Sequence, residues 1–147
     1  MPSPGLRICF LLSTRGFLFG GLETIADQLA TGLARRGHHV TFIAGLGLGR
    51  PTRRDLPAGL ARLAVPVVPH TAPANRAVGR LLHLPPLHLQ SLSFVAACLV
   101  APATRRALQQ ADVAVTFLEA EAVLVSRLLG RRGVGSIHYF AGAIDLG

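Results

Sequence analysis

The residues Leu6–Ser13, LRICFLLS, form the first regular element that the sequence suggests. A short apolar run of this kind is typical of a strand buried on both faces of a parallel sheet. After a glycine-containing loop over Thr14–Gly21, apolar residues recur at helical spacing from Leu22 to Leu33, and Gly37 marks the end of that helix. His39–Ala44 then reads as a second strand. A strand, a helix and another strand in succession predict an α/β fold.

The rest of the chain continues the alternation. Strands are predicted at about 6–13, 39–44, 61–68, 112–117 and 133–139, the third of them at an edge because Pro66 interrupts it. A long buried helix kinked at Pro102 is predicted over Leu87–Gln110, a shorter helix over Ala120–Leu129, and irregular connections over Gly45–Gly59 and His70–Pro86. The expected fold is a Rossmann-like doubly wound parallel sheet, one domain over residues 1–147.

Composition narrows the class of protein. Half of the 147 residues are hydrophobic, which favours a packed core over disorder. The two cysteines cannot make a disulfide scaffold and are expected to be buried, reduced thiols, with no cluster suited to a metal. No stretch reads as a membrane span or a signal peptide, so we expect a cytoplasmic protein.

The charge is strongly positive. The net charge is +8, and all fifteen basic residues are arginine. Such a chain could attract nucleic acid, an anionic membrane or a phosphorylated ligand. Aromatic residues make up only 5%, which disfavours nucleic-acid binding by stacking. Most arginine pairs fall at predicted helix ends, where the helix dipole explains them, but Arg50, Arg53 and Arg54 crowd one loop that could meet a membrane or a phosphorylated acceptor.

Ligands of parallel α/β sheets bind beyond the carboxyl ends of the strands, so the loops at that edge carry the candidate sites. Gly20 and Gly21 stand where the first strand leads into the first helix, and their backbone amides could approach an anion. They do not complete G-x-G-x-x-G, and the chain has no lysine for a phosphate-binding loop, so no cofactor is expected. Gly37-His38-His39 lies at the opposite edge and is predicted to be a helix stop.

Three segments together resemble a known family. The first segment is Gly20-Gly21-Leu22-Glu23, followed by a helix and by Leu33–Thr41, LARRGHHVT. The second is the strand Ala111–Val115, followed by Leu118-Glu119. The third is Ser136-Ile137-His138, which ends the last strand. This order is similar to the N-terminal, acceptor-side domain of family-four retaining glycosyltransferases, which have the GT-B fold. The resemblance covers nearly all of the chain but only half of such an enzyme, since the C-terminal donor-binding domain has no counterpart here.

The resemblance implies the acceptor-binding half of an enzyme that transfers a sugar from a nucleotide-sugar donor to a sugar or lipid-linked acceptor. It implies His138 as the catalytic residue, partly exposed and facing the acceptor, with Gly20, Gly21, Arg15 and Glu119 as substrate-binding residues. The chain alone is expected to be inactive and to pair with a donor-binding domain, a partner chain or itself. Relatives that act on lipid-linked acceptors suggest contact with the inner face of the membrane.

A second hypothesis remains open at this point. The chain could be a non-catalytic Rossmann-like module that binds a nucleotide or pairs with a partner chain. In that case Gly20-Gly21 only makes a tight turn, His138 is a core or surface histidine, and Glu119 and Arg15 are solvated loop residues.

Overall fold

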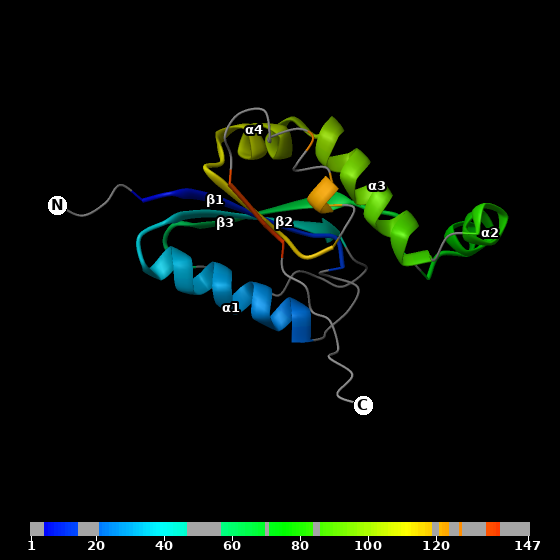
Figure 1. The fold of residues 1–147 in the computed structure, drawn as a ribbon, viewed down its shortest axis with the longest axis horizontal. Helices are drawn as coiled ribbons and strands as arrows, with labels where there is room; N and C mark the ends of the chain where they lie inside the picture. Colours follow the sequence, from blue (N-terminus) through cyan, green and yellow to red (C-terminus); the bar gives the residue numbers. More distant parts are fainter. Residues whose placement is uncertain are drawn as a thin grey trace.

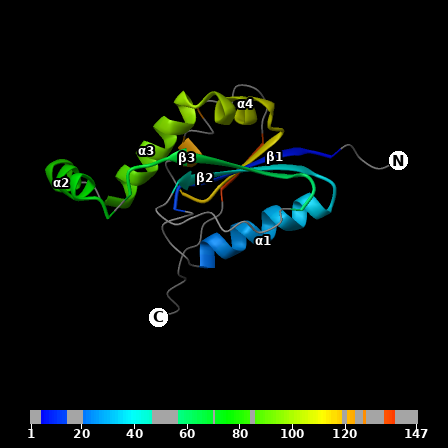
Figure 2. The same cartoon turned by 180° about the vertical axis from the view of Figure 1, so that it is seen from behind.

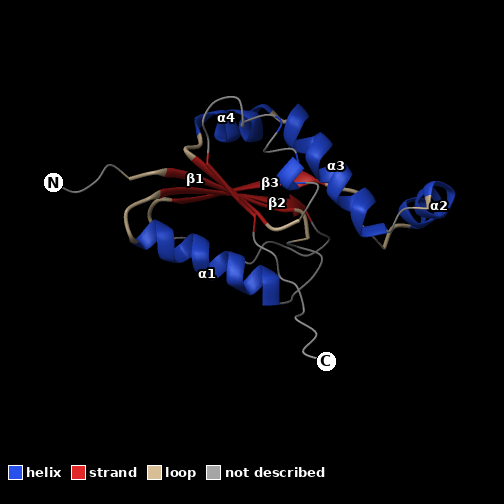
Figure 3. Cartoon of the chain, in the orientation of Figure 1, coloured by secondary structure: helices blue, strands red, loops and turns tan. Residues whose placement is uncertain are grey.

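The computed structural model describes residues 5–14, 21–46, 57–69, 71–83, 86–118, 121–123, 127 and 135–138, without the side chains of residues 86–88 and 135–138. The described chain forms one sheet between two helical layers (Figure 3). This is the α/β, Rossmann-like class that the alternation predicts.

All five strands are parallel and are ordered β3-β2-β1-β4-β5. They are β1 (Arg7–Leu12), β2 (His39–Leu46), β3 (Leu60–Pro66), β4 (Val113–Thr116) and β5 (Gly135–His138). Each lies within two residues or so of its predicted range, and β3 is the edge strand that Pro66 indicates. The central strand β1 pairs with β2 on one side and β4 on the other, and five of its six residues are buried.

Helices cover both faces of the sheet. Helix α1 (Gly21–Arg35) lies on one face, and α3 (Pro86–Val100) and α4 (Pro102–Gln110) lie on the other (Figures 1 and 2). Because successive strand residues point to opposite faces, β1 feeds two cores. Phe10 stacks between Phe42 and Phe117 on the α1 side, at centroid distances of 5.8 and 6.1 Å. Cys9 and Leu11 pack with α3 and α4 on the other.

The first helix ends as its sequence predicts. Arg35 is its last residue, and Gly37 follows with φ +88, a conformation that glycine adopts without strain. His38 comes next, and its Nδ1 accepts a hydrogen bond from the Leu6 N–H at 3.2 Å. The expected structural role of this segment is confirmed.

Two predictions about the helical layer are wrong. The long helix over Leu87–Gln110 is two helices, because Ala101 before Pro102 is extended (ψ 119) and Pro102 starts a new helix. Thr104 Oγ1 holds this break by donating to the Cys98 and Ala101 carbonyls at 2.8 and 2.9 Å.

The other error concerns the segment predicted to be irregular over His70–Pro86. It contains the helix α2 (Pro73–Leu82). Pro73 stands at its first turn, where a proline favours the start of a helix rather than its interruption. Helix α2 lies beyond the outer end of α3, away from the sheet (Figure 1).

Candidate functional site

The strand order places a topological switch point between β1 and β4. From β1 the chain moves outward to β2 and β3, and then returns to build β4 and β5 on the opposite side. Crevices form at such points, outside the carboxyl ends of the strands, and this is where open α/β sheets bind ligands. Ser13 and Thr14 follow β1 at this place, and Phe117 and Leu118 follow β4.

Ser13 connects three elements at the switch point. Its backbone N–H donates to Glu121 Oε1 at 2.7 Å, and its carbonyl accepts from Gln90 Nε2 of α3 at 3.1 Å. Its hydroxyl shares a hydrogen bond of 3.3 Å with the Ser91 hydroxyl. All four residues are buried. The end of β1 is therefore fixed by side chains rather than by continued pairing.

Thr14 joins the same edge to α1. Its Oγ1 donates to Glu23 Oε1 at 2.8 Å, and both side chains are buried. Glu23 lies in the first turn of α1, where a carboxylate also interacts favourably with the positive end of the helix dipole. Glu23 thus holds Thr14, the second residue after β1, against the first turn of α1.

Glu121 has the most perturbed carboxyl in the described part of the chain. Burial raises its pKa from 4.5 to about 7. Hydrogen bonds from Ser13 and from the backbones of Phe117 and Leu118 oppose this effect and lower the pKa. Its second oxygen, Oε2, is buried and has no hydrogen-bond partner among the described residues. Burial disfavours the charged form of the Glu121 carboxyl, so it can hold a proton near neutrality inside the fold.

A close backbone approach shapes the neighbouring strand end. A Cβ at Gly45 of β2 would collide with the Ser13 carbonyl oxygen and would crowd Val67 Cγ2 at 3.1 Å. Only glycine lets β2 pass this close to the Ser13–Glu121 network. Sequence reasoning assigned Gly45 to a loop, whereas it lies within β2.

The residues predicted to bind substrate are placed only in part. Gly21 starts α1, is exposed, and would carry a Cβ without contact, so its backbone geometry does not demand glycine. His138 is the last residue of β5 and pairs with Thr116, the last residue of the neighbouring strand β4. Its backbone therefore lies at the carboxyl edge of the sheet. The His138 side chain, Gly20, Arg15 and Glu119 lie outside the described part, so their roles stay predictions.

Sequence reasoning missed the buried network itself. Signals for it exist: Ser13-Thr14 is the first polar pair after an apolar strand, Gln90 interrupts an apolar helix, and Glu121 is only two residues beyond Glu119. None of these marks a site by type or spacing alone. Their convergence depends on three crossovers of the chain, which a local pattern does not reveal.

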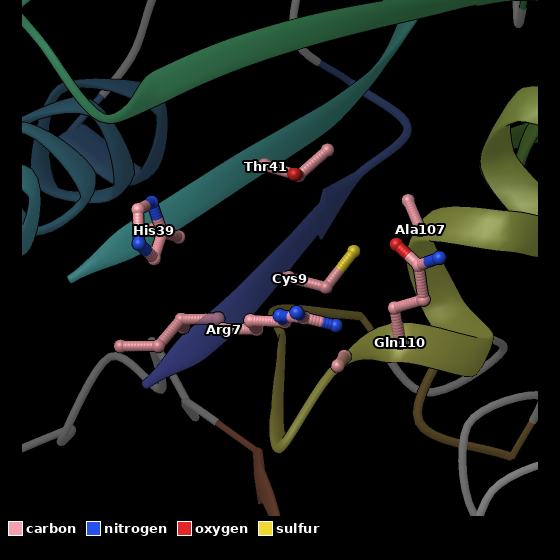
Figure 4. Close-up of a pocket in the computed structure, with 8 residues that line it drawn as sticks. Arg7, Cys9, His39, Thr41, Ala107 and Gln110 are labelled. Carbon is pink, nitrogen blue, oxygen red and sulfur yellow. The ribbon is translucent and has the colours of Figure 1, made fainter. Parts of the chain in front are cut away.

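A hollow of about 340 Å³ lies at the opposite, amino edge of the sheet (Figure 4). Cys9 and Thr41 line it from adjacent strands and Gln110 from α4, with Arg7 and His39 at the strand starts. Burial, with a smaller effect of Cys98, raises the pKa of the Cys9 thiol to about 12, so it stays protonated and unreactive near neutral pH. The hollow is also remote from the strand ends where such sheets bind ligands, and the carboxyl edge is therefore the stronger candidate.

The described ranges contain no group of three His, Cys, Asp or Glu that could hold a metal ion. No described helix is long and apolar enough to cross a membrane. Both cysteines are buried free thiols. No protein-family model and no curated protein matches this chain.

Proposed function

We propose that this chain is the acceptor-binding half of a glycosyltransferase that uses a nucleotide-sugar donor. The proposal is supported first by the order of segments that resembles family-four enzymes. The structural observation that carries it is the buried network at the switch point, where Glu121 and Glu23 fix the two residues that follow β1. A rigid polar edge of this kind suits a site that must orient a sugar hydroxyl.

Sugar transfer divides its demands between two domains. The donor half holds the diphosphate that leaves, and the acceptor half presents one hydroxyl to the electrophilic sugar carbon. In the proposal His138 contacts that hydroxyl, since a neutral imidazole can accept its proton near pH 7. Gly20, Gly21, Arg15 and Glu119 bind the acceptor around it. Glu121 keeps the first strand end in place by accepting a hydrogen bond from the Ser13 N–H.

The partners follow from this division. The carboxyl edge would close against a donor-binding domain, a partner chain or a second copy of this chain. The acceptor is a sugar, free or lipid-linked, and the proposal places the chain at the inner face of the membrane when the acceptor is lipid-linked.

The test is direct acceptor binding. The immobilised chain is offered an array of free and lipid-linked saccharides in the absence of nucleotide sugar, and retention of a subset is expected. His138→Ala should weaken retention by about three- to tenfold, the worth of roughly one hydrogen bond. His39→Ala is the matched control at the amino edge, where the exposed His39 should not matter.

Two results would overturn the proposal. Retention of no saccharide would remove its basis, and so would equal retention by the His138→Ala and His39→Ala variants. Binding of a free nucleotide without any saccharide would instead support the non-catalytic, nucleotide-binding module.

A further inference from the structure

The hollow at the amino edge of the sheet collects polar side chains from three elements (Figure 4). Arg7 of β1 pairs with His39 of β2 where the two strands begin. Two residues further along, Cys9 pairs with Thr41. Paired residues on adjacent strands, and residues two apart on one strand, point to the same face of a sheet. These four side chains therefore face the layer of α3 and α4, from which Gln110 lines the hollow.

The hollow exists because the helical layer does not cover this corner of the sheet. Helix α4 packs on β1, where its residue Leu108 joins Cys9 in one buried cluster. The start of β2 lies beside α4 rather than beneath it (Figure 4). A ligand can therefore reach the polar side chains of this corner without a change in the fold.

The polar side chains of the hollow have no partner within the described part of the chain. Arg7, His39 and Gln110 are exposed, and Thr41 is half-buried. None of the four side chains makes a hydrogen bond or an ion pair with another described residue. Together they present a guanidinium, an imidazole, a hydroxyl and a primary amide, all of which can donate hydrogen bonds. Four donors at one hollow are thus free to bind a ligand.

The acidic residue beside the hollow does not pair with the Arg7 guanidinium. Asp112 precedes β4, and its Oδ2 accepts a hydrogen bond from the Arg7 backbone N–H at 2.8 Å. The Asp112 N–H in turn donates to the Arg7 carbonyl, also at 2.8 Å. The carboxylate is thus engaged by the Arg7 backbone, and no ion pair joins it to the guanidinium among the described residues. The Arg7 side chain instead extends toward α4 (Figure 4).

The charges at this corner favour an anion with a single negative charge. Arg7 supplies one permanent positive charge. Asp112 lies beside it, and α4 ends at Gln110, where the last carbonyls form the negative end of the helix dipole. A phosphate monoester carries nearly two negative charges near neutral pH, so it would meet too little positive charge here. A carboxylate carries one, and its two oxygens match the paired N–H groups of a guanidinium.

We propose that this hollow binds a small hydroxy acid, a molecule with one carboxylate and one hydroxyl group. The Arg7 guanidinium binds the carboxylate, and the neighbouring His39 ring donates to the same group. Thr41 and Gln110 bind the hydroxyl, since a hydroxyl and an amide can each donate and accept. The volume of about 340 Å³ suits a small molecule, because ligand pockets span roughly 300–1,000 Å³. The site lies at the edge opposite the proposed acceptor site, so the inference does not depend on sugar transfer.

The experiment is a titration of the isotopically labelled chain, followed by nuclear magnetic resonance at constant ionic strength. The probes are glycolate, acetate, acetamide and inorganic phosphate. Glycolate and acetate should shift the amides of Cys9, Thr41 and Gln110 in a saturable way and leave the Ser13 and Thr14 amides unchanged. Glycolate should bind about fivefold more tightly than acetate, because its hydroxyl adds a hydrogen bond. Acetamide has the shape of acetate without its charge and should not bind.

Variants separate the two parts of the site. Arg7→Gln should weaken glycolate binding roughly tenfold or more, since it removes hydrogen bonds to a charged group. Arg35→Gln is the matched control, because it removes an equal charge from an exposed helix end on the other face of the sheet, and it should leave binding unchanged. Thr41→Val keeps the shape of the side chain and should weaken glycolate binding about fivefold without affecting acetate. Circular dichroism confirms that each variant is folded.

Several results would overturn the proposal. Absence of a saturable shift with glycolate, or equal binding of acetate and acetamide, would remove the carboxylate site, and both are measured on the native chain. Equal effects of Arg7→Gln and Arg35→Gln would show a response to overall charge rather than to a site. Tighter binding of phosphate than of glycolate would also overturn it, because the hollow would then be a site for phosphoryl groups.

Discussion

Glu121 is a carboxyl group that burial keeps protonated up to about pH 7. In the unfolded chain the same group loses its proton near pH 4.5. Between these values the folded state binds more protons than the unfolded state, so Glu121 makes the fold less stable as the pH rises through this window. Above about pH 7 both states are ionised, and this decrease stops.

Glu121→Gln should remove that dependence. Glutamine keeps an oxygen for the Ser13 N–H but never ionises. The difference in free energy of unfolding between the variant and the native chain should grow in favour of the variant as the pH rises from 4.5 to about 7. The total change should be roughly 3 kcal/mol at most, which corresponds to the shift between those two pKa values. Urea unfolding of both chains across this range measures it. A difference that does not change with pH would contradict the burial of the Glu121 charge.

Gly45 gives a steric test of the same network. Gly45→Ala should destabilise the fold by about 1–3 kcal/mol, because the new methyl group would displace the Ser13 carbonyl. Gly32→Ala is the matched control, since a Cβ at Gly32 of α1 meets nothing within 4 Å and alanine favours a helix by about 0.5–1 kcal/mol. The free energy of unfolding, measured by chemical denaturation, should therefore decrease for Gly45→Ala and increase for Gly32→Ala.

Single residues show where sequence reasoning stopped. Ser13 could be placed at the end of the first strand, because an apolar run ends there. Its partners Glu121 and Gln90 are 108 and 77 residues away. Nothing in the local sequence indicates these contacts. The sequence therefore pointed to Glu119, whereas the carboxyl that accepts the Ser13 N–H belongs to Glu121.

At the scale of elements, the strands were predictable and α2 was not. Each strand is a short apolar or β-branched run, and such runs have few alternatives in an alternating chain. Helix α2 is framed by Pro73 and by the prolines after Leu82, and its buried positions are a polar residue and a glycine. Its large apolar residues face away from the domain, so the apolar spacing that identifies a core-facing helix does not predict it.

Asn75→Ala should loosen α2 without unfolding the sheet. The variant removes the donor to the Pro69 and Val68 carbonyls, and a lost hydrogen bond of this kind costs about 1 kcal/mol. Amide hydrogen exchange should quicken across Pro73–Leu82 by roughly fivefold, the factor that this free energy represents. Exchange in α1 should stay as in the native chain. Unchanged exchange in α2 would show that Asn75 does not fix its orientation.

At the scale of the whole molecule, the described residues form a two-faced α/β sheet whose switch point carries the candidate site. The α/β class and the strand order are shared by proteins of many activities. The proposed activity is therefore argued from the residues of the candidate site and from the sequence resemblance, not from the fold.

The isolated chain should turn over neither UDP-glucose nor GDP-mannose with any sugar acceptor. As the proposed acceptor half, the chain would hold only one side of a two-domain cleft and could not align donor with acceptor, and alignment can supply about 7–11 kcal/mol of the barrier. Product formation followed by mass spectrometry measures it. Turnover by the chain alone at an ordinary enzymatic rate, on the order of 1–10³ s⁻¹, would contradict the assignment of this chain to the acceptor half.

The most direct measurement maps where an acceptor sugar binds. The isotopically labelled chain is titrated with octyl glucoside and octyl mannoside below their micelle concentrations, and separately with UDP-glucose, while amide resonances are followed by nuclear magnetic resonance. We expect a glycoside to shift the amides of Ser13, Thr14, Thr116 and Phe117 at the carboxyl edge, and UDP-glucose to shift them far less. Glycoside shifts confined to the hollow around Arg7 and His39, absence of any glycoside shift, or tight binding of UDP-glucose alone would contradict it.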